Sequence, residues 1–298
     1  MKLILSKGNS KKFQNFFYKL SEDYNLDADY TNYQKILFII NNNFVNASLL
    51  GIGKHISDYN FVYFKSYFDN IEVASSIAMI LDSLHIQYID KEVGRSVSLS
   101  KLSMNTKLAL NKISIPSTFA GYSAAINQGI DSGIISINKK MVLKRADADR
   151  GIDNYLVESE KEVKEIINQT PALWILQEYI LNSGFYRIVV YGGKARLGIF
   201  RSLEKRPDGN KRKAHIYKPR GGINACLLTI ADIPKNIVEI SENSATIMNR
   251  QVAGVDVLVS NLDNKPYILE VNNNPELVNV VTFQSERRRA LADYLREF

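Results

Sequence analysis

The sequence is poor in the residues that build covalent or metal-based scaffolds. It has one cysteine, Cys226, and three histidines among 298 residues. A single cysteine excludes an intramolecular disulfide and a cysteine metal cluster, and it is typical of a reducing compartment. Because the three histidines are scattered along the chain, no Ser-His-Asp or Cys-His catalytic arrangement is indicated.

Long apolar runs are also absent. The first segment turns polar after residues 3–5, whereas a secretory signal needs a longer apolar core. No run approaches the roughly 20 apolar residues of a membrane span. With 45% hydrophobic and 23% charged residues, the composition is that of an ordinary globular protein. We therefore expect a soluble, cytoplasmic chain with two or three subdomains and no membrane association.

The charge balance is basic. The formal net charge is +7, and residues 194–220 hold ten basic residues against two acidic ones, Glu204 and Asp208. Such a balance is compatible with nucleic acid, an acidic substrate, ATP or a solvated basic loop. Tyr217 is the only aromatic residue in residues 202–220. Nucleic-acid binding is therefore not favoured, because it needs stacking groups beside the charge.

The first hundred residues alternate between strand and helix patterns, which predicts a small open α/β domain. The expected elements are a helix at 13–20, a buried strand at 35–40, a strand at 61–64, a helix at 71–84 and a strand at 86–90.

The remainder mixes helices with strand pairs, so the fold class is α/β (α+β) overall. The middle of the chain predicts helices at 101–111, 122–129 and 159–168, and strands at 141–144, 154–157 and 174–180. Hairpins are expected at 187–191 with 195–200, around Gly192-Gly193, and at 255–260 with 267–272. Helices are expected at 237–249 and 285–298.

The last hairpin carries the strongest functional signal. Asp256 lies on one strand, and Glu270 and Asn272 lie two residues apart on the other, so both point to one face. Three oxygen donors on one sheet face suit Mg²⁺. The alternative is a charged outer face of a surface hairpin. Glu270 lies within a strongly apolar strand, however, and a buried carboxylate needs a partner charge or a metal.

Residues 252–258 and 269–275 resemble the metal-binding end of ATP-grasp enzymes. Within that superfamily the chain is most similar to the RimK-like amino-acid ligases, which add glutamate to a protein C-terminus, and to their glutathione-synthetase-like peptide-ligase relatives. The resemblance covers about residue 101 to the C-terminus. Residues 1–100 resemble the family's N-terminal domain in pattern only.

Further positions match the family in chain order. The resemblance implies that Lys101, fifteen residues before Pro116, and Lys144 reach the ATP phosphates, that the loop containing Gly151 caps them, and that Arg187 contacts the transferred phosphate. It also implies the adenine edge (Gln177, Glu178, Tyr179 and Ile180) and places Arg220 in a late R-G-G turn near the acceptor site. Arg201 and Arg220 are our candidates for holding the substrate carboxylate, because arginine grips carboxylates with paired hydrogen bonds.

The resemblance implies an ATP-grasp fold. It comprises a Rossmann-like pre-ATP-grasp domain (1–100), a central lid subdomain (101–176) and a C-terminal subdomain with the metal site (177–298), the last two sandwiching ATP. The implied cofactors are ATP and two ions of Mg²⁺ or Mn²⁺. The implied activity is ATP-dependent amide-bond formation through an acyl phosphate.

The implied partners are a carboxylate substrate and an amine acceptor. We expect the basic residues 205–218 to recruit an acidic peptide or protein tail. A homo-oligomer is possible.

Other functions stay open at this point. A nucleotide-binding ATP-grasp protein without ligase activity is one alternative, because residues 145–153 contain a single glycine. An ATP-grasp kinase that phosphorylates a group other than a carboxylate is another, and a nucleic-acid-binding protein is a distant third. Residues 51–55 mimic a P-loop but lack its first glycine and the Ser/Thr after the lysine.

Overall fold

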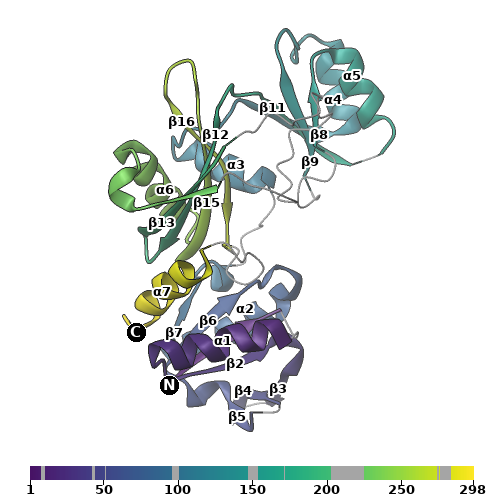
Figure 1. Cartoon of the computed structure of the whole chain (residues 1–298). Coiled ribbons are helices and arrows are strands. Elements are labelled where there is room, and N and C mark those ends of the chain that lie inside the picture. The colour runs from purple at the N-terminus through teal and green to yellow at the C-terminus, as the bar shows by residue number, and fades with distance from the viewer. Residues whose placement is uncertain are drawn as a thin grey trace.

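The computed structural model describes residues 1–7, 11–41, 44–50, 52–95, 101–146, 154–170, 172–202, 225–273, 275 and 283–298. Within these residues a parallel sheet with a small antiparallel sheet beside it forms one end of the molecule. A five-stranded sheet lies in the middle, and a four-stranded sheet lies at the other end (Figure 1). The predicted mixed α/β class is confirmed. None of the helices described here has the length and apolar character that crossing a membrane requires.

The N-terminal sheet is a layer of four parallel strands covered by a helix on each face. Its strands, in spatial order, are β2 (Ala28–Asn32), β1 (Lys2–Ser6), β6 (Phe61–Lys65) and β7 (Gln87–Ile89). Helix α1 (Lys11–Tyr24) covers one face and α2 (Ile71–Ser83) the other. Strand alternation divides the core: Ile4 packs with α1, whereas Leu3 and Leu5 pack with α2.

Residues 35–40 differ from the prediction. They fall mostly in β3 (Ile36–Asn41), which pairs antiparallel with β4 (Phe44–Leu49), and β5 (Lys54–His55) completes this small separate sheet. Leu37 is 52% exposed, so the expectation of a buried strand is wrong there. The β-branched content correctly indicates a strand, but it does not determine the sheet to which the strand belongs.

The sheet at the far end, with its two helices, is called the lid below. Its antiparallel strands, in spatial order, are β10 (Asn154–Val157), β9 (Met141–Arg145), β11 (Leu173–Glu178) and β8 (Thr118–Tyr122). Helices α4 (Ser123–Asp131) and α5 (Glu160–Ile167) pack on one face around Trp174 and Leu143. The Ser159 side chain caps α5 by accepting a hydrogen bond from the Glu162 N–H at 3.3 Å.

The middle sheet carries both predicted hairpins. Its antiparallel strands, in spatial order, are β14 (Ala225–Leu228), β13 (Lys194–Ser202), β12 (Gly184–Tyr191), β15 (Val252–Val259) and β16 (Pro266–Asn272). Gly192 and Gly193 have φ angles of 59° and 75°, which a two-residue hairpin turn requires and glycine adopts without strain.

One face of this sheet is covered by α6 (Lys235–Ile247) and α3 (Lys101–Leu110). Strand β16 is at the edge of the sheet, and the α3 region covers its outer side. The Ile268 N–H donates to the Ser114 carbonyl at 2.8 Å, and the Val271 N–H donates to Met104 Sδ at 3.2 Å. These contacts satisfy backbone groups that an edge strand would otherwise expose.

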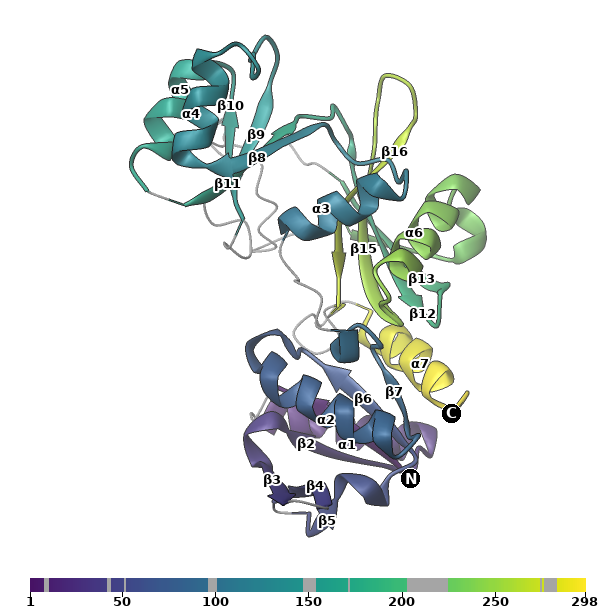
Figure 2. The ribbon, with the colours of Figure 1, turned by 180° about the vertical axis from the view of Figure 1, so that it is seen from behind.

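Helix α7 (Gln284–Leu295) joins the middle sheet to the N-terminal sheet (Figure 2). Its residues Leu291 and Leu295 share a hydrophobic core with Phe16 and Phe17 of α1 and with Tyr191 of β12. The two sheets are therefore held together by a continuous apolar core.

Candidate active site

Three charged residues form a row across neighbouring strands of the middle sheet. Arg187 on β12 is paired with Asp256 on β15, and Asp256 is paired with Glu270 on β16. Directly paired residues of antiparallel strands point to the same face. That face is opposite α6, because the alternating neighbours Ile188 and Val255 lie in the core beneath α6. The structure thus brings together the two carboxylates that the hairpin pattern predicts.

Arg187 holds Asp256 through two hydrogen bonds. Its Nε donates to Oδ1 at 2.7 Å and one terminal nitrogen donates to Oδ2 at 2.6 Å. Both side chains are about one-tenth exposed, and this two-bonded geometry is the strong form of an arginine–carboxylate pair. Each carboxylate oxygen keeps a second acceptor position. Asp256 is therefore fixed in orientation and can still accept another ligand.

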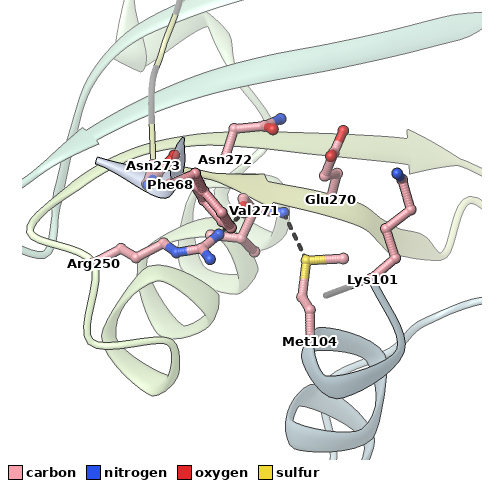
Figure 3. Close-up of a pocket in the computed structure, with 8 residues that line it drawn as sticks. All are labelled: Phe68, Lys101, Met104, Arg250, Glu270, Val271, Asn272 and Asn273. Atoms are coloured by element: carbon pink, nitrogen blue, oxygen red, sulfur yellow. Dashed lines mark hydrogen bonds between the residues drawn. The ribbon is translucent and has the colours of Figure 1, made fainter. Parts of the chain in front are cut away.

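Glu270 and Asn272 project from one side of β16, whereas Val271 points to the other side (Figure 3). A cavity of about 50 Å³ lies beside them. Two carboxylates and one amide on a common face are the oxygen donors that Mg²⁺ prefers, and phosphate oxygens or water usually complete its shell. The described residues contain no group of three or more His, Cys, Asp and Glu side chains that could hold a metal. The amide of Asn272 stays the predicted third donor beside the two carboxylates.

Gly254 leaves room on this face for Pro275. It is paired with Asn272 across β15 and β16. A Cβ at this position would lie 3.2 Å from the Pro275 Cβ and 3.9 Å from the Arg187 Cδ. The absence of a side chain therefore allows Pro275 to pack beside the predicted metal ligands. The chemistry of the donors Asp256, Glu270 and Asn272 suits a divalent cation, and metal binding by them stays a prediction.

Lys144, on β9 of the lid, lies near Glu270 of this row. Its Nζ donates to Gln177 Oε1 at 2.7 Å, and Gln177 Nε2 donates to Thr118 Oγ1 at 3.1 Å. Burial lowers the pKa of Lys144 from 10.5 to about 8; the charge of Glu270 opposes this shift, and the charge of Lys101 adds to it. Lys144, Lys101 and Glu270 are therefore within electrostatic reach, although they belong to three different elements.

Lys101 begins α3 and lines the cavity near Glu270 (Figure 3). Its Nζ donates to the carbonyl of Ala146, the residue after β9, at 3.5 Å. Lys101 thus lies between the strand that carries Glu270 and the lid strand that carries Lys144. This position is suited to a group that neutralises phosphate charge.

The segment expected to bind adenine consists of the last two residues of β11 and the first two residues of its connection to β12. The Glu178 N–H donates to the Ser117 carbonyl at 2.8 Å, and the Tyr179 N–H donates to the Lys140 carbonyl at 3.2 Å. Ile180 is buried. Two N–H groups of the segment therefore bind within the protein, and adenine binding at this segment stays a prediction.

Arg201 lies on the same sheet face as Arg187, because it is paired with Phe185, two residues before Arg187 on β12. It is 6% exposed, and its guanidinium lies 5.7 Å from the centre of the Phe185 ring. Gly151, Arg220 and the basic residues 205–218 lie outside the described residues.

Comparison with known proteins decides the family. The sequence model of the RimK-like ATP-grasp domain matches residues 98–294. The chain belongs to the RimK-like ATP-grasp family. The matched region runs from just before α3 into α7, so it contains the Arg187–Asp256–Glu270 row and both lysines.

A relative and two solved structures extend the comparison. A probable alpha-L-glutamate ligase of Syntrophotalea carbinolica is 25% identical over 213 residues, which cover 70% of this chain and 66% of that protein. The chain thus spans slightly less than two thirds of that relative's length.

The structure of ATP-grasp ligase PsnB complexed with a phosphomimetic variant of its minimal precursor, Mg and ADP has a TM-score of 0.69 at 11% identity, covering 99% of this chain and 97% of PsnB. A Chryseobacterium gregarium RiPP-associated ATP-grasp ligase, in complex with ADP and a leader and core peptide, has a TM-score of 0.64 at 12% identity, covering 99% and 96%. The predicted ATP-grasp fold is confirmed.

Arg250, which no sequence pattern predicted, supports the site in this RimK-like chain. Arg250 Nε donates to Glu92 Oε2 at 2.8 Å, and another Arg250 nitrogen donates to the Val271 carbonyl. The Tyr67 hydroxyl donates to the same Glu92 oxygen at 3.1 Å. Arg250 therefore ties the N-terminal domain to the strand that carries Glu270. No local pattern marks it, since Glu92 lies 158 residues away.

Proposed function

We propose that this RimK-like ATP-grasp protein is an ATP-dependent carboxylate–amine ligase that forms an amide bond through an acyl phosphate. The observation that carries the proposal is the row of Arg187, Asp256 and Glu270, with Lys101 and Lys144 within electrostatic reach of Glu270. Carboxylates that can hold a cation stand beside lysines that can neutralise phosphate. Phosphoryl transfer needs this combination of positioning and charge compensation.

Each residue has a separate role in this proposal. Asp256, Glu270 and Asn272 would hold Mg²⁺ or Mn²⁺, which would supply positive charge that offsets the charge of the phosphates. Lys144 and Lys101 place positive charge at the outer phosphates. Arg187 orients Asp256 through two N–H donors and places its positive charge on the face where the phosphoryl group is transferred.

The reaction then proceeds in two steps. A substrate carboxylate oxygen attacks the γ-phosphorus, an O–P bond forms, the bond from the γ-phosphorus to the bridging oxygen breaks, and ADP leaves. The amine nitrogen then attacks the acyl carbon, a C–N bond forms, the C–O bond to phosphate breaks, and inorganic phosphate leaves as the amine loses a proton. Arg201 and Arg220 hold the substrate carboxylate, because guanidinium groups grip carboxylates with paired hydrogen bonds.

The same comparison supports a proposal for the substrate class. The name of the S. carbinolica relative supports a glutamate substrate, and the peptide complex of the C. gregarium ligase supports a peptide acceptor. We propose an amino acid such as glutamate together with an acidic peptide or protein. In this proposal residues 1–100 are the pre-ATP-grasp domain, residues 101–176 the central subdomain and residues 177–298 the C-terminal subdomain, with α3 reaching from the second onto the third.

The test is substrate-dependent phosphate release from Mg-ATP. A panel of amino acids and acidic peptides is compared for the wild type, Glu270→Gln and Glu239→Gln, which changes an exposed glutamate on α6. We expect release with at least one carboxylate–amine pair, its loss in Glu270→Gln and its retention in Glu239→Gln. Hydroxylamine in place of the amine should give a hydroxamate, because it captures an acyl phosphate. Phosphate transfer to a hydroxyl without amide formation would instead indicate a kinase, and absence of ATP binding would contradict the proposal.

A further inference from the structure

The N-terminal sheet has a groove along its outer strand. Within the described part of the chain β2 pairs with β1 alone. All five residues of β2 line a groove of about 510 Å³. Since side chains of a strand point alternately to opposite faces, a groove that touches five consecutive residues must run along the hydrogen-bonding edge. The groove is therefore shaped to receive another extended chain.

Two walls enclose this edge, and Figure 1 shows α1 on one side of β2 with β3 and β4 on the other. Helix α1 contributes Gln14, Asn15, Phe17, Tyr18 and Ser21 to the lining. Leu50 and Ile52 form the opposite wall. Tyr18 and Leu50 are 67% and 50% exposed, so each wall offers a large apolar side chain to an occupant.

The charges at the two ends of the groove differ. Helix α1 runs back across the sheet, so its first turn lies at the end where β1 and β2 finish. Lys7, Lys11 and Lys35 are exposed at this end, and the N-terminus of α1 adds partial positive charge. At the other end Asp27 pairs with the N-terminal ammonium and Asp23 pairs with Arg288.

The basic end is also the end nearer the active site. Phe68, just after β6, lines the same small cavity as Glu270 and Asn272. A chain in the groove would therefore place its acidic residues at the end of the sheet from which Phe68 reaches that cavity.

We propose that the β2 groove binds an extended peptide segment of the substrate as an added strand, with acidic residues of that segment at the Lys11–Lys35 end. Such β-augmentation derives affinity from backbone hydrogen bonds and specificity from flanking side chains. The inference rests on the proposed ligase function and adds a docking site for the peptide substrate outside the region matched by the family model.

A second copy of the chain is a poorer occupant. A symmetric pair would have to bring two identical β2 edges together. Each edge is recessed between α1 on one side and the side chains of Leu50 and Ile52 on the other, so these walls of the two copies would collide first. A single extended peptide has no such walls and can enter the groove.

Binding can be measured without catalysis. The probe is a fluorescein-labelled peptide in which alternating valine and threonine residues follow a run of glutamates, titrated by fluorescence anisotropy in the absence of ATP. We expect Asn15→Trp, which fills the groove from an exposed helix position, to weaken binding by roughly tenfold or more. Lys19→Trp, on the same helix but outside the lining, should bind as the wild type does. The double change Lys11→Glu with Lys35→Glu should weaken binding and reduce its salt dependence.

Hydrogen exchange locates the peptide. The amides of β2 should exchange more slowly when the peptide is bound, because an added strand occupies their edge. Equal binding by Asn15→Trp and the wild type, or protection elsewhere with β2 unchanged, would overturn the inference. Protection of β2 together with a concentration-dependent dimer in the absence of peptide would assign the groove to a second copy and would also overturn it.

The experiment separates this inference from the proposed function. Glu270→Gln should bind the peptide as tightly as the wild type while losing ATP-dependent ligation. Peptide docking in a wild-type chain that ligates nothing would contradict the ligase proposal alone. Ligation of free amino acids by a chain that never binds the peptide at β2 would contradict the docking site alone.

Discussion

Replacing Arg250 by methionine tests whether the N-terminal domain is tied to the metal-binding strand by a buried charge pair. The Arg250 side chain is 3% exposed and that of Glu92 is 0% exposed. Removal of the guanidinium leaves a buried carboxylate whose remaining donor in the described structure is the Tyr67 hydroxyl. Breaking one side of a buried ion pair destabilises proteins by about 3–5 kcal/mol. The Val271 carbonyl loses a donor as well.

The expected result is a large loss of stability together with weaker Mg²⁺-dependent binding of ADP. Urea unfolding should show a loss of about 3–5 kcal/mol, and the Tm should fall by roughly 5–15 °C. Because Val271 lies between Glu270 and Asn272, the Mg²⁺ concentration needed for half-maximal ADP binding should rise while the protein is still folded.

Two controls make this result decisive. Arg289→Met removes an arginine whose side chain is 78% exposed and should change stability by less than about 0.5 kcal/mol. The double variant Glu92→Leu with Arg250→Met should recover most of the loss, because no buried charge is left alone. A loss below about 1 kcal/mol in Arg250→Met, or no recovery in the double variant, would refute the reasoning.

Three other substitutions give independent checks. Burial lowers the pKa of Lys65 from 10.5 to about 7, so burying its charged form destabilises the folded state fully below pH 7 and no longer above pH 10.5. Lys65→Met should therefore raise the free energy of unfolding by about 3–5 kcal/mol at pH 7 and leave it unchanged above pH 10.5. Equal gains in urea unfolding at both pH values would contradict this. Lys144→Met should lower kcat by about 10²–10³-fold without lowering the Tm, and unchanged kcat would exclude Lys144 from phosphate binding. Gly254→Ala should weaken Mg²⁺ binding in the presence of ADP by about tenfold, because its Cβ would press on Pro275; calorimetry showing wild-type affinity would argue against that packing.

Periodic patterns predicted most elements because each depends on nearby residues. The buried residues Phe16, Phe17 and Leu20 of α1 repeat at helical spacing, and the Gly192-Gly193 turn indicates its own hairpin. Strand β1 was not assigned, because its apolar core is only three residues long. Its place at the centre of the N-terminal sheet depends on β2 and β6, which are distant in sequence.

In the candidate site, too, local patterns predict some features, whereas others depend on residues that are distant in sequence. Glu270 and Asn272 could be placed on one face, since strand alternation is local, and Asp256 could be placed opposite them by the hairpin. The two-bonded contact of Arg187 with Asp256 spans 69 residues, and no spacing rule predicts it. The lowered pKa of Lys144 likewise results from its burial, and this burial exists only in the folded chain.

The packing of α7 constrains when the first domain can form during synthesis. The α1 face of the N-terminal sheet includes Phe61, whose ring stacks on Phe298 at 4.3 Å between ring centres, and Leu295 lies in the same core as Phe16 and Leu20. On the ribosome, a chain that has emerged only through the lid still exposes this surface to solvent. The apolar core around Phe16 and Phe61 is therefore completed only after α7 has been translated, and until then its surface is open to non-native contacts.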